Sequence, residues 1–131
     1  WLLERAGIAF EAQSHLSYFA GEGAHAWGPM LAMAVAGLLV PLAEEILFRG
    51  YIQGAFRLYA GPVIAVVVTA TLFGLMHGML YAVPLGLLGV LFGVLRQRFD
   101  CLEAPVFAHA LHNSLTVALV YCYPSILDVY G

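Results

Sequence analysis

The sequence contains no lysine, few charged residues of any kind and only two cysteines. Charged residues make up 10% of the chain, whereas a soluble domain carries about 25%, so the composition argues against a water-facing globular surface. The net charge of −3 excludes a basic surface for nucleic acid and a polybasic patch for anionic lipid. Cys101 and Cys122 lack CxxC spacing, which argues against a disulfide scaffold and a thiolate metal site.

Apolar residues, in contrast, are abundant and form long runs. They make up 63% of the 131 residues, and stretches of 21, 38 and 24 residues without Asp, Glu, Lys or Arg follow Glu22, Arg57 and Glu103. About 20 apolar residues span a bilayer core, and turn signals divide the longest stretch near its middle. The sequence therefore predicts an all-α, polytopic transmembrane helical bundle with about four membrane helices.

Proline positions mark where the helices begin. A proline is tolerated in the first turn of a helix, because the N–H that it lacks has no intrahelical partner there. On this basis four helices are predicted, at residues 28–57, 62–79, 84–98 and 105–122. Pro41 lies inside the first of them and is expected to kink it.

Three segments are expected along the chain. Residues 1–27 mix charged and apolar side chains and would form an interfacial segment or the tail of an upstream helix. Residues 28–123 would form the membrane core, and residues 124–131 a C-terminal tail. Arginines close the first and third predicted helices, so they fall on one side of the bundle, which the positive-inside tendency assigns to the cytoplasm.

Two adjacent acids and an arginine interrupt the first apolar run, at Glu44, Glu45 and Arg49. Ionisable groups inside membrane spans are costly and are functional by default. Glu45 and Arg49 are four residues apart and would pair on one helix face. Glu44 points about 100° away and would be a carboxylate available as a general base. The alternative is that the helix leaves the membrane here and that these charges are only solvated.

Histidines interrupt two further apolar runs. His77 lies in the 38-residue stretch, where a function and a hydrogen bond between helices are equally compatible with it. His109 and Asn113 are four residues apart, so they share a helix face and could donate hydrogen bonds to a developing oxyanion. The alternative is polar packing between helices. His112, on the flank of that face, is assigned to packing.

If these residues form one site, they must lie at similar distances from the cytoplasmic ends of their helices. At 1.5 Å per residue, Glu44 lies about 20 Å and His77 about 24 Å from the cytoplasmic helix ends. His109 lies only about 8 Å along its helix. The levels therefore match only if the segment 100–103 lies below the membrane surface.

Together these residues form three motifs: EExxxR at Glu44–Arg49, FxxxH at Phe73–His77 and HxxxN at His109–Asn113. In this order they resemble the CPBP family, which joins CAAX proteases, including the type II CAAX prenyl endopeptidases, with bacteriocin-processing enzymes and bacterial Abi proteins. The resemblance covers about residues 28–123. It implies an all-α membrane bundle with more helices than this chain supplies.

The resemblance also implies an activity and assigns roles. The protein would be an intramembrane endopeptidase, in which Glu44 and His77 hold and activate the attacking water. His109 and Asn113 would donate to the oxyanion of the tetrahedral intermediate.

Other motif residues would support this site. Glu45 and Arg49 would support Glu44 or position the substrate, and Phe73 belongs to the same supporting group. No cofactor is expected, because the sequence lacks the HExxH motif that puts two zinc ligands and a base on one helical face. A zinc site is the alternative, with ligands drawn from Glu44, His77, His109 and His112.

Expected partners are a peptide or protein substrate, lipidated or not, and membrane lipid, with no nucleic acid. The expected location is the plasma membrane of a bacterium or archaeon, with the active site in the cytoplasmic half. A non-catalytic bacteriocin-immunity or scaffold protein of the same fold is the main alternative. A proton-coupled transporter with Glu44 and His77 as a relay is another, although no internal inverted repeat is visible.

Overall fold

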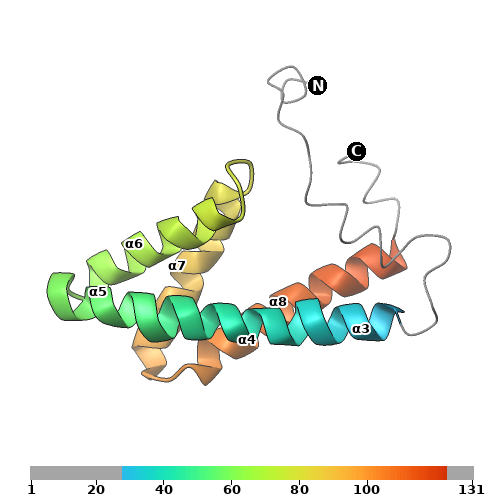
Figure 1. The fold of residues 1–131 in the computed structure, drawn as a ribbon, viewed down its shortest axis with the longest axis horizontal. Helices are drawn as coiled ribbons and strands as arrows, with labels where there is room; N and C mark the ends of the chain where they lie inside the picture. Colours follow the sequence, from blue (N-terminus) through green and yellow to red (C-terminus); the bar gives the residue numbers. More distant parts are fainter. Residues whose placement is uncertain (1–27, 124–131) are drawn as a thin grey trace, which may run out of the picture.

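The computed structural model describes residues 28–123, and every regular element in that range is helical, which confirms the all-α prediction (Figure 1). The elements are α3 (Gly28–Ala34), η1 (Val35–Leu39), α4 (Val40–Glu45), η2 (Ile46–Ile52), α5 (Gln53–Ala60), α6 (Pro62–Met76), α7 (Ala82–Phe99) and α8 (Glu103–Cys122). The segments predicted at 1–27 and 124–131 lie outside the described residues.

The first five elements follow one another without a break and form one long helix, called here the long helix, in which η1 and η2 are π-helical turns (Figure 1). α6 and α7 form an antiparallel hairpin against one half of it. α8 runs antiparallel to the other half, since Asn113 meets Ala36 while His109 meets Glu45. Figure 1 shows the tip of the α6–α7 hairpin pointing away from the long helix, while α8 runs along its α3 half.

The predicted helix boundaries are close to those observed, and the differences have local causes. α6 ends at Met76, three residues before the predicted end, because Gly78 takes a positive φ of 93° that a helix does not continue through. α7 ends where Asp100 adopts the left-handed conformation, with φ 49°. Aspartate tolerates that conformation better than most residues.

Pro41 does not kink the long helix as expected; Figure 1 shows no sharp bend at α4. The preceding turn η1 is π-helical, and the Val40 N–H bonds to the carbonyl of Val35, five residues back. A proline in an ordinary α-helix collides with the carbonyl four residues before it. The wider π turn accommodates the ring, so the helix continues in its direction.

Glycine allows α6 and α7 to pack with their backbones close together. A Cβ atom at Gly74 would collide with the Ala82 carbonyl oxygen, and one at Gly89 would lie 3.0 Å from the Ala70 Cα. Next to this contact, Phe48, Phe73 and Phe92 form the buried aromatic core. The small residues on this face of α7 therefore serve helix packing.

Two helices among residues 28–123 are long and apolar enough to cross a membrane, Met30–Ala60 and Ala82–Phe99, and Pro62–Met76 is a shorter apolar helix. Large apolar side chains face outward on these helices, as Val63, 73% exposed, and Leu87, 68% exposed, illustrate. An apolar exterior of this extent requires a cover other than water. The number of four membrane spans stays a prediction.

Candidate active site

Glu44 lies in α4, the short α-helical stretch between the two π turns of the long helix. Such turns are frequent at functional sites. Its side chain is 26% exposed, and its two oxygens face different histidines. Oε1 lies 3.8 Å from His77 Nε2, and Oε2 lies 3.6 Å from His109 Nε2. The structure thus brings together three of the residues selected from the sequence.

His77 is the residue at which α6 ends, at the tip of the hairpin. Its Nδ1 atom lies 2.7 Å from the carbonyl oxygen of Phe73, four residues earlier. A carbonyl only accepts hydrogen bonds, so Nδ1 carries the proton and donates it. In the neutral imidazole, Nε2 is then a bare acceptor that faces Glu44.

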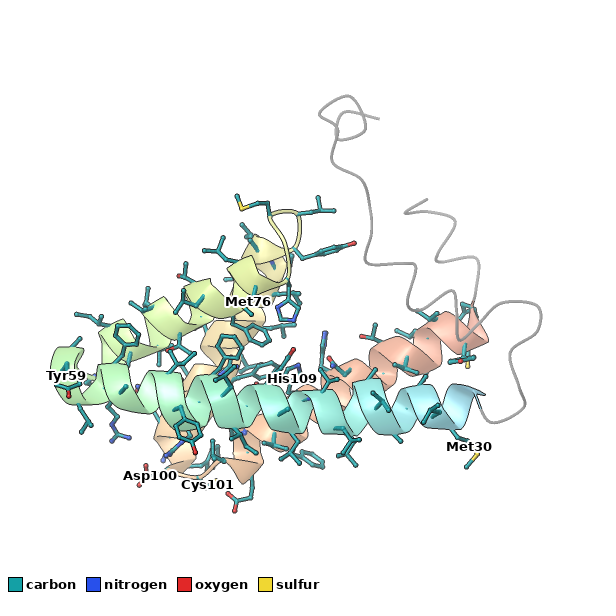
Figure 2. All side chains as sticks on the ribbon, viewed as in Figure 1. Met30, Tyr59, Met76, Asp100, Cys101 and His109 are labelled. Carbon is teal, nitrogen blue, oxygen red and sulfur yellow. The ribbon has the colours of Figure 1, made fainter. Side chains whose placement is uncertain are left out.

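His109 is fixed in the same manner from α8. Its side chain is 5% exposed, and Nδ1 lies 2.8 Å from Glu45 Oε1. The ring stacks on Phe92, with 4.7 Å between centroids and 20° between planes. Figure 2 places His109 at the centre of the molecule, where α8 passes the middle of the long helix. Its Nε2 atom is thereby directed at Glu44.

The protonation of His109 follows from these contacts. Glu45 Oε1 also accepts a hydrogen bond from Arg49 at 2.9 Å, as an ionised carboxylate does. His109 Nδ1 therefore donates to Glu45, and Nε2 carries a proton only in the imidazolium form. His109 can donate to an oxyanion only when it is charged, a condition that motif spacing does not reveal.

Glu45 and Arg49 form a fully buried ion pair on one face, as the i,i+4 spacing predicts. We expected this pair to support Glu44. In the structure it holds His109 through Glu45, and Arg49 Nη2 donates to the Gly89 carbonyl of α7 at 3.0 Å. The guanidinium also lies 4.6 Å from the ring centroid of Phe73. A buried charge is tolerable only with such partners.

Asn113 reaches the site from the next turn of α8. Its Nδ2 atom donates to the Ala36 carbonyl oxygen at 3.0 Å, and one N–H of the amide remains. The side chain also lines a cavity of about 150 Å³ that contains Glu44, His77 and His109. The four residues assigned to chemistry from the motifs thus surround one cavity.

Several lining residues were not found, or not assigned to the site, from the sequence. His112, expected to be a packing residue, contributes to the cavity wall. Leu85, Leu88 and Phe92 of α7 form its apolar side. The one available signal was Phe92, a lone aromatic residue between the closely packing Gly89 and Gly93.

The mismatch in depth is resolved at the α7–α8 turn. A Cβ atom on Gly50 would lie 3.6 Å from Leu102 Cδ1, so the part of the turn from which α8 begins lies beside Gly50, whereas Asp100 lies near Arg57. Seven residues later, α8 brings His109 to the level of Glu45. The levels of Glu44 and His109 therefore match, with Glu44 Oε2 3.6 Å from His109 Nε2.

The arginine ends lie together on one side of the bundle, as predicted. Arg96 and Arg57 each place an Nη1 atom near Asp100 Oδ1, at 3.1 and 3.5 Å. The hydrogen bond from Arg96 and the charges of both arginines lower the pKa of Asp100 below its ordinary value. This exposed cluster ties the end of the long helix to the α7–α8 turn.

The residues do not form a metal site of ordinary geometry. Between Gly28 and Tyr123, no three His, Cys, Asp or Glu side chains are arranged to hold an ion. We therefore derive no catalytic step through a metal.

An apolar helical bundle in which Glu44, His77 and His109 line a small cavity, beside a buried Glu45–Arg49 pair, is a membrane protein with a polar interior site. The family model of the type II CAAX prenyl endopeptidase Rce1-like proteins matches residues 26–115, a range that contains all three motifs. The chain belongs to this Rce1-like family, which confirms the resemblance to the CAAX endopeptidases.

A curated relative agrees with the family. A Bacillus subtilis (strain 168) protein named "Putative membrane peptidase YdiL" is 30% identical over 90 residues, which are 68% of this chain and 37% of that protein. The chain thus spans little more than a third of that relative's length. No solved structure matches the chain. The family and this relative both carry the names of peptidases.

Proposed function

We propose that this protein is an intramembrane endopeptidase that uses a glutamate-activated water and no metal. The observation that carries the proposal is the position of the Glu44 carboxylate. Its two oxygens lie 3.8 and 3.6 Å from the Nε2 atoms of His77 and His109. These atoms share a cavity of about 150 Å³, large enough for water and the reacting peptide bond.

The 3.8 Å between Glu44 Oε1 and His77 Nε2 fits a bridging water. A molecule about 2.8 Å from each atom would donate one hydrogen bond to the carboxylate and one to the imidazole. The imidazole acceptor is oriented before substrate arrives, because Phe73 O fixes the tautomer of His77. The oxygen lone pairs of that water would then face the open part of the cavity, where a substrate carbonyl would be attacked.

The oxyanion would be stabilised from α8. The second N–H of the Asn113 amide and the Nε2–H of a protonated His109 are the donors that we assign. Glu45 lies 2.8 Å from His109 Nδ1 and would orient that imidazolium, whose charge the Glu44 carboxylate, 3.6 Å from Nε2, would balance. Arg49 neutralises Glu45 in turn, which limits the cost of holding these charges in an apolar interior.

The proton balance needs no other group. The water oxygen bonds to the carbonyl carbon while Glu44 takes a water proton, which leaves a tetrahedral oxyanion. When the C–N bond breaks, Glu44 returns a proton to the leaving amine nitrogen. The products are a carboxylic acid and an amine, and Glu44 is again a carboxylate.

The substrate would be a peptide or protein segment that reaches the cavity from the bilayer, with or without a lipid group. We place the protein in the membrane as a multi-pass protein with the arginine-rich side toward the cytoplasm. The apolar wall formed by Leu85, Leu88 and Phe92 suits an extended, uncharged segment.

The test is peptide cleavage by the purified, detergent-solubilised protein. A library of quenched fluorescent peptides identifies a cleaved sequence, and kcat is then measured for the parent and for Glu44→Gln. Loss of the base is expected to reduce kcat about 10²–10⁴-fold. Glu103→Gln is the matched control, because Glu103 is an exposed acid at the start of α8; its kcat is expected to stay at the parent value.

Two outcomes would overturn the proposal. Cleavage by Glu44→Gln at the parent rate would exclude Glu44 as the base. Cleavage that disappears with a strong chelator and returns with added zinc would exclude the metal-free mechanism.

A further inference from the structure

The backbone around Pro41 has two carbonyl groups to which this residue cannot bond. Proline has no N–H. In the π register of the preceding turn, where Val40 bonds to Val35, an N–H at position 41 would reach the Ala36 carbonyl. In the α register it would reach the Gly37 carbonyl. Neither acceptor receives a hydrogen bond from Pro41.

Two adjacent side chains of α8 bond to these two carbonyls. Asn113 Nδ2 donates to Ala36 O at 3.0 Å, and Ser114 Oγ lies 3.5 Å from Gly37 O. The close approach depends on Gly37, because a Cβ atom there would lie 2.7 Å from Ser114 Oγ. Asn113 therefore bonds to the carbonyl that an N–H at position 41 would reach in the π register of this turn.

The two side chains lie on different flanks of α8. Asn113 lines the cavity with Glu44 and His109, whereas Ser114 lines a separate apolar groove. The bond to Ala36 engages one N–H of the Asn113 amide and so determines where the other points. His109, one turn earlier on the same helix face, is held independently by Glu45.

We propose that Pro41 is a positioning residue of the active site, which acts by leaving the Ala36 carbonyl to Asn113. This inference rests on the proposed function, in which Asn113 donates to the oxyanion. Pro41 is fully buried and has no polar side-chain atom, so it does not act on substrate itself. An alanine at this position would restore an N–H beside the same carbonyls, and that N–H would compete with the Asn113 amide.

The first measurement is an NMR spectrum, which does not depend on peptide cleavage by the protein. Asn113 is the one asparagine in the 131 residues, so labelling with ¹⁵N-asparagine gives a side-chain amide signal that Asn113→Gln identifies by removing it. Pro41→Ala is expected to shift the two amide proton resonances, because Nδ2 loses its bond to Ala36. Pro105→Ala is the matched control: Pro105 is equally buried but lies in the first turn of α8, where an added N–H has no helical acceptor. An unchanged spectrum in Pro41→Ala would overturn the proposal.

The second measurement is a double-mutant cycle on peptide cleavage. Asn113→Ala is expected to lower kcat about 10²–10³-fold, the usual effect of losing one oxyanion donor. Pro41→Ala is expected to lower kcat by about 10-fold with little change in KM, a fraction of that donor's effect. The double variant should be no slower than Asn113→Ala, because both changes remove the same donor. Multiplicative losses would show that Pro41 acts elsewhere and would overturn the inference.

To exclude loss of folded protein as the cause of these effects, the variants are compared at temperatures below their unfolding midpoints. Pro41→Val also restores the N–H, and it replaces Pro41→Ala in both measurements if the alanine variant does not fold. The outcomes separate the two proposals. If Glu44→Gln cleaves like the parent, the proposed function fails, whereas the Asn113 spectrum still decides whether Pro41 controls the amide.

Discussion

The α6–α7 contact and the contact between α8 and the long helix join helices in opposite ways. Between α6 and α7, side chains are absent where the backbones meet, at Gly74 and Gly89. Between α8 and the long helix, polar side chains cross the contact, with Asn113 bonded to a backbone carbonyl and His109 to Glu45. The α6–α7 contact depends mainly on close backbone packing, with one hydrogen bond from Gln97 to the Pro62 carbonyl, whereas the α8 contact adds buried polar side chains to the close approach at Gly37.

The difference shows how an apolar bundle separates stability from chemistry. Lipid is as apolar as leucine, so helices in a membrane gain from close packing and from hydrogen bonds between them. The α6–α7 contact at Gly74 and Gly89, called here the glycine contact, contains no titratable group and only holds the two helices together. The polar contact lies next to the cavity. Its hydrogen bonds also orient groups at the site, because Glu45 holds the His109 ring and the Ala36 carbonyl holds the Asn113 amide.

The largest loss of stability is expected from Glu45→Ala, at the polar contact. The change would leave Arg49 buried without its carboxylate partner, which costs about 3–5 kcal/mol. The unfolding free energy in detergent should fall accordingly, and His109 should lose its orientation. Thermal unfolding followed by circular dichroism measures the first effect.

Glu45→Gln is the informative companion to that variant. Its amide oxygen can still accept from His109 Nδ1, so it should retain more stability than Glu45→Ala while lowering peptide cleavage. Equal stability of Glu45→Ala and the parent would show that the polar contact adds nothing to folding, and the comparison between the two contacts would fail.

An intermediate effect is expected from Gly74→Ala at the glycine contact. The added methyl group would collide with the Ala82 carbonyl and lie 2.9 Å from the Gly86 nitrogen. Backbone atoms cannot move aside cheaply, so overpacking should cost about 1–3 kcal/mol. Unfolding temperatures of the two proteins measure this loss.

Gly54→Ala is the matched control, because a Cβ atom built there has no neighbour within 4 Å apart from the adjoining residues and backbone of its own helix. A helical alanine is about 0.5–1 kcal/mol more stable than glycine, so this variant should be slightly stabilised. A similar gain in Gly74→Ala would show that α6 and α7 do not depend on the glycine contact.

The smallest effect is expected from Asp100→Asn, outside both contacts. Arg96 and the charge of Arg57 lower the pKa of Asp100 in the folded protein, so the ionised carboxylate stabilises the fold at neutral pH. That contribution should be lost as the pH falls from about 4, the ordinary value for aspartate, through the lowered pKa. Asparagine keeps the left-handed backbone accessible.

The measurement for this pair is the unfolding temperature between pH 3 and 7. The parent should exceed Asp100→Asn by a small margin at neutral pH, since exposed pairs contribute little, and the two should converge in acid. If the difference in unfolding temperature between the parent and Asp100→Asn does not change with pH, the charge of the carboxylate is not its source.

Much of the fold was predictable because apolar runs and prolines are local signals. Four helices were placed within three residues of their observed ends, and the Glu45–Arg49 pair followed from helical spacing. The ion pair's second partner was not predictable, since His109 comes from α8, 64 residues away in the chain. The absence of a kink at Pro41 was missed because spacing does not reveal a π turn.

The sequence by itself determined the apolar helices, the order of the motifs and which side chains share a helix face, because these depend on composition and a period of 3.6 residues. Only the tertiary structure decided which faces meet, that the α7–α8 turn lies deep enough to bring His109 to Glu44, and which imidazole nitrogens are bare. These depend on contacts between helices, where a carbonyl released by one residue is bonded by a side chain from another part of the chain.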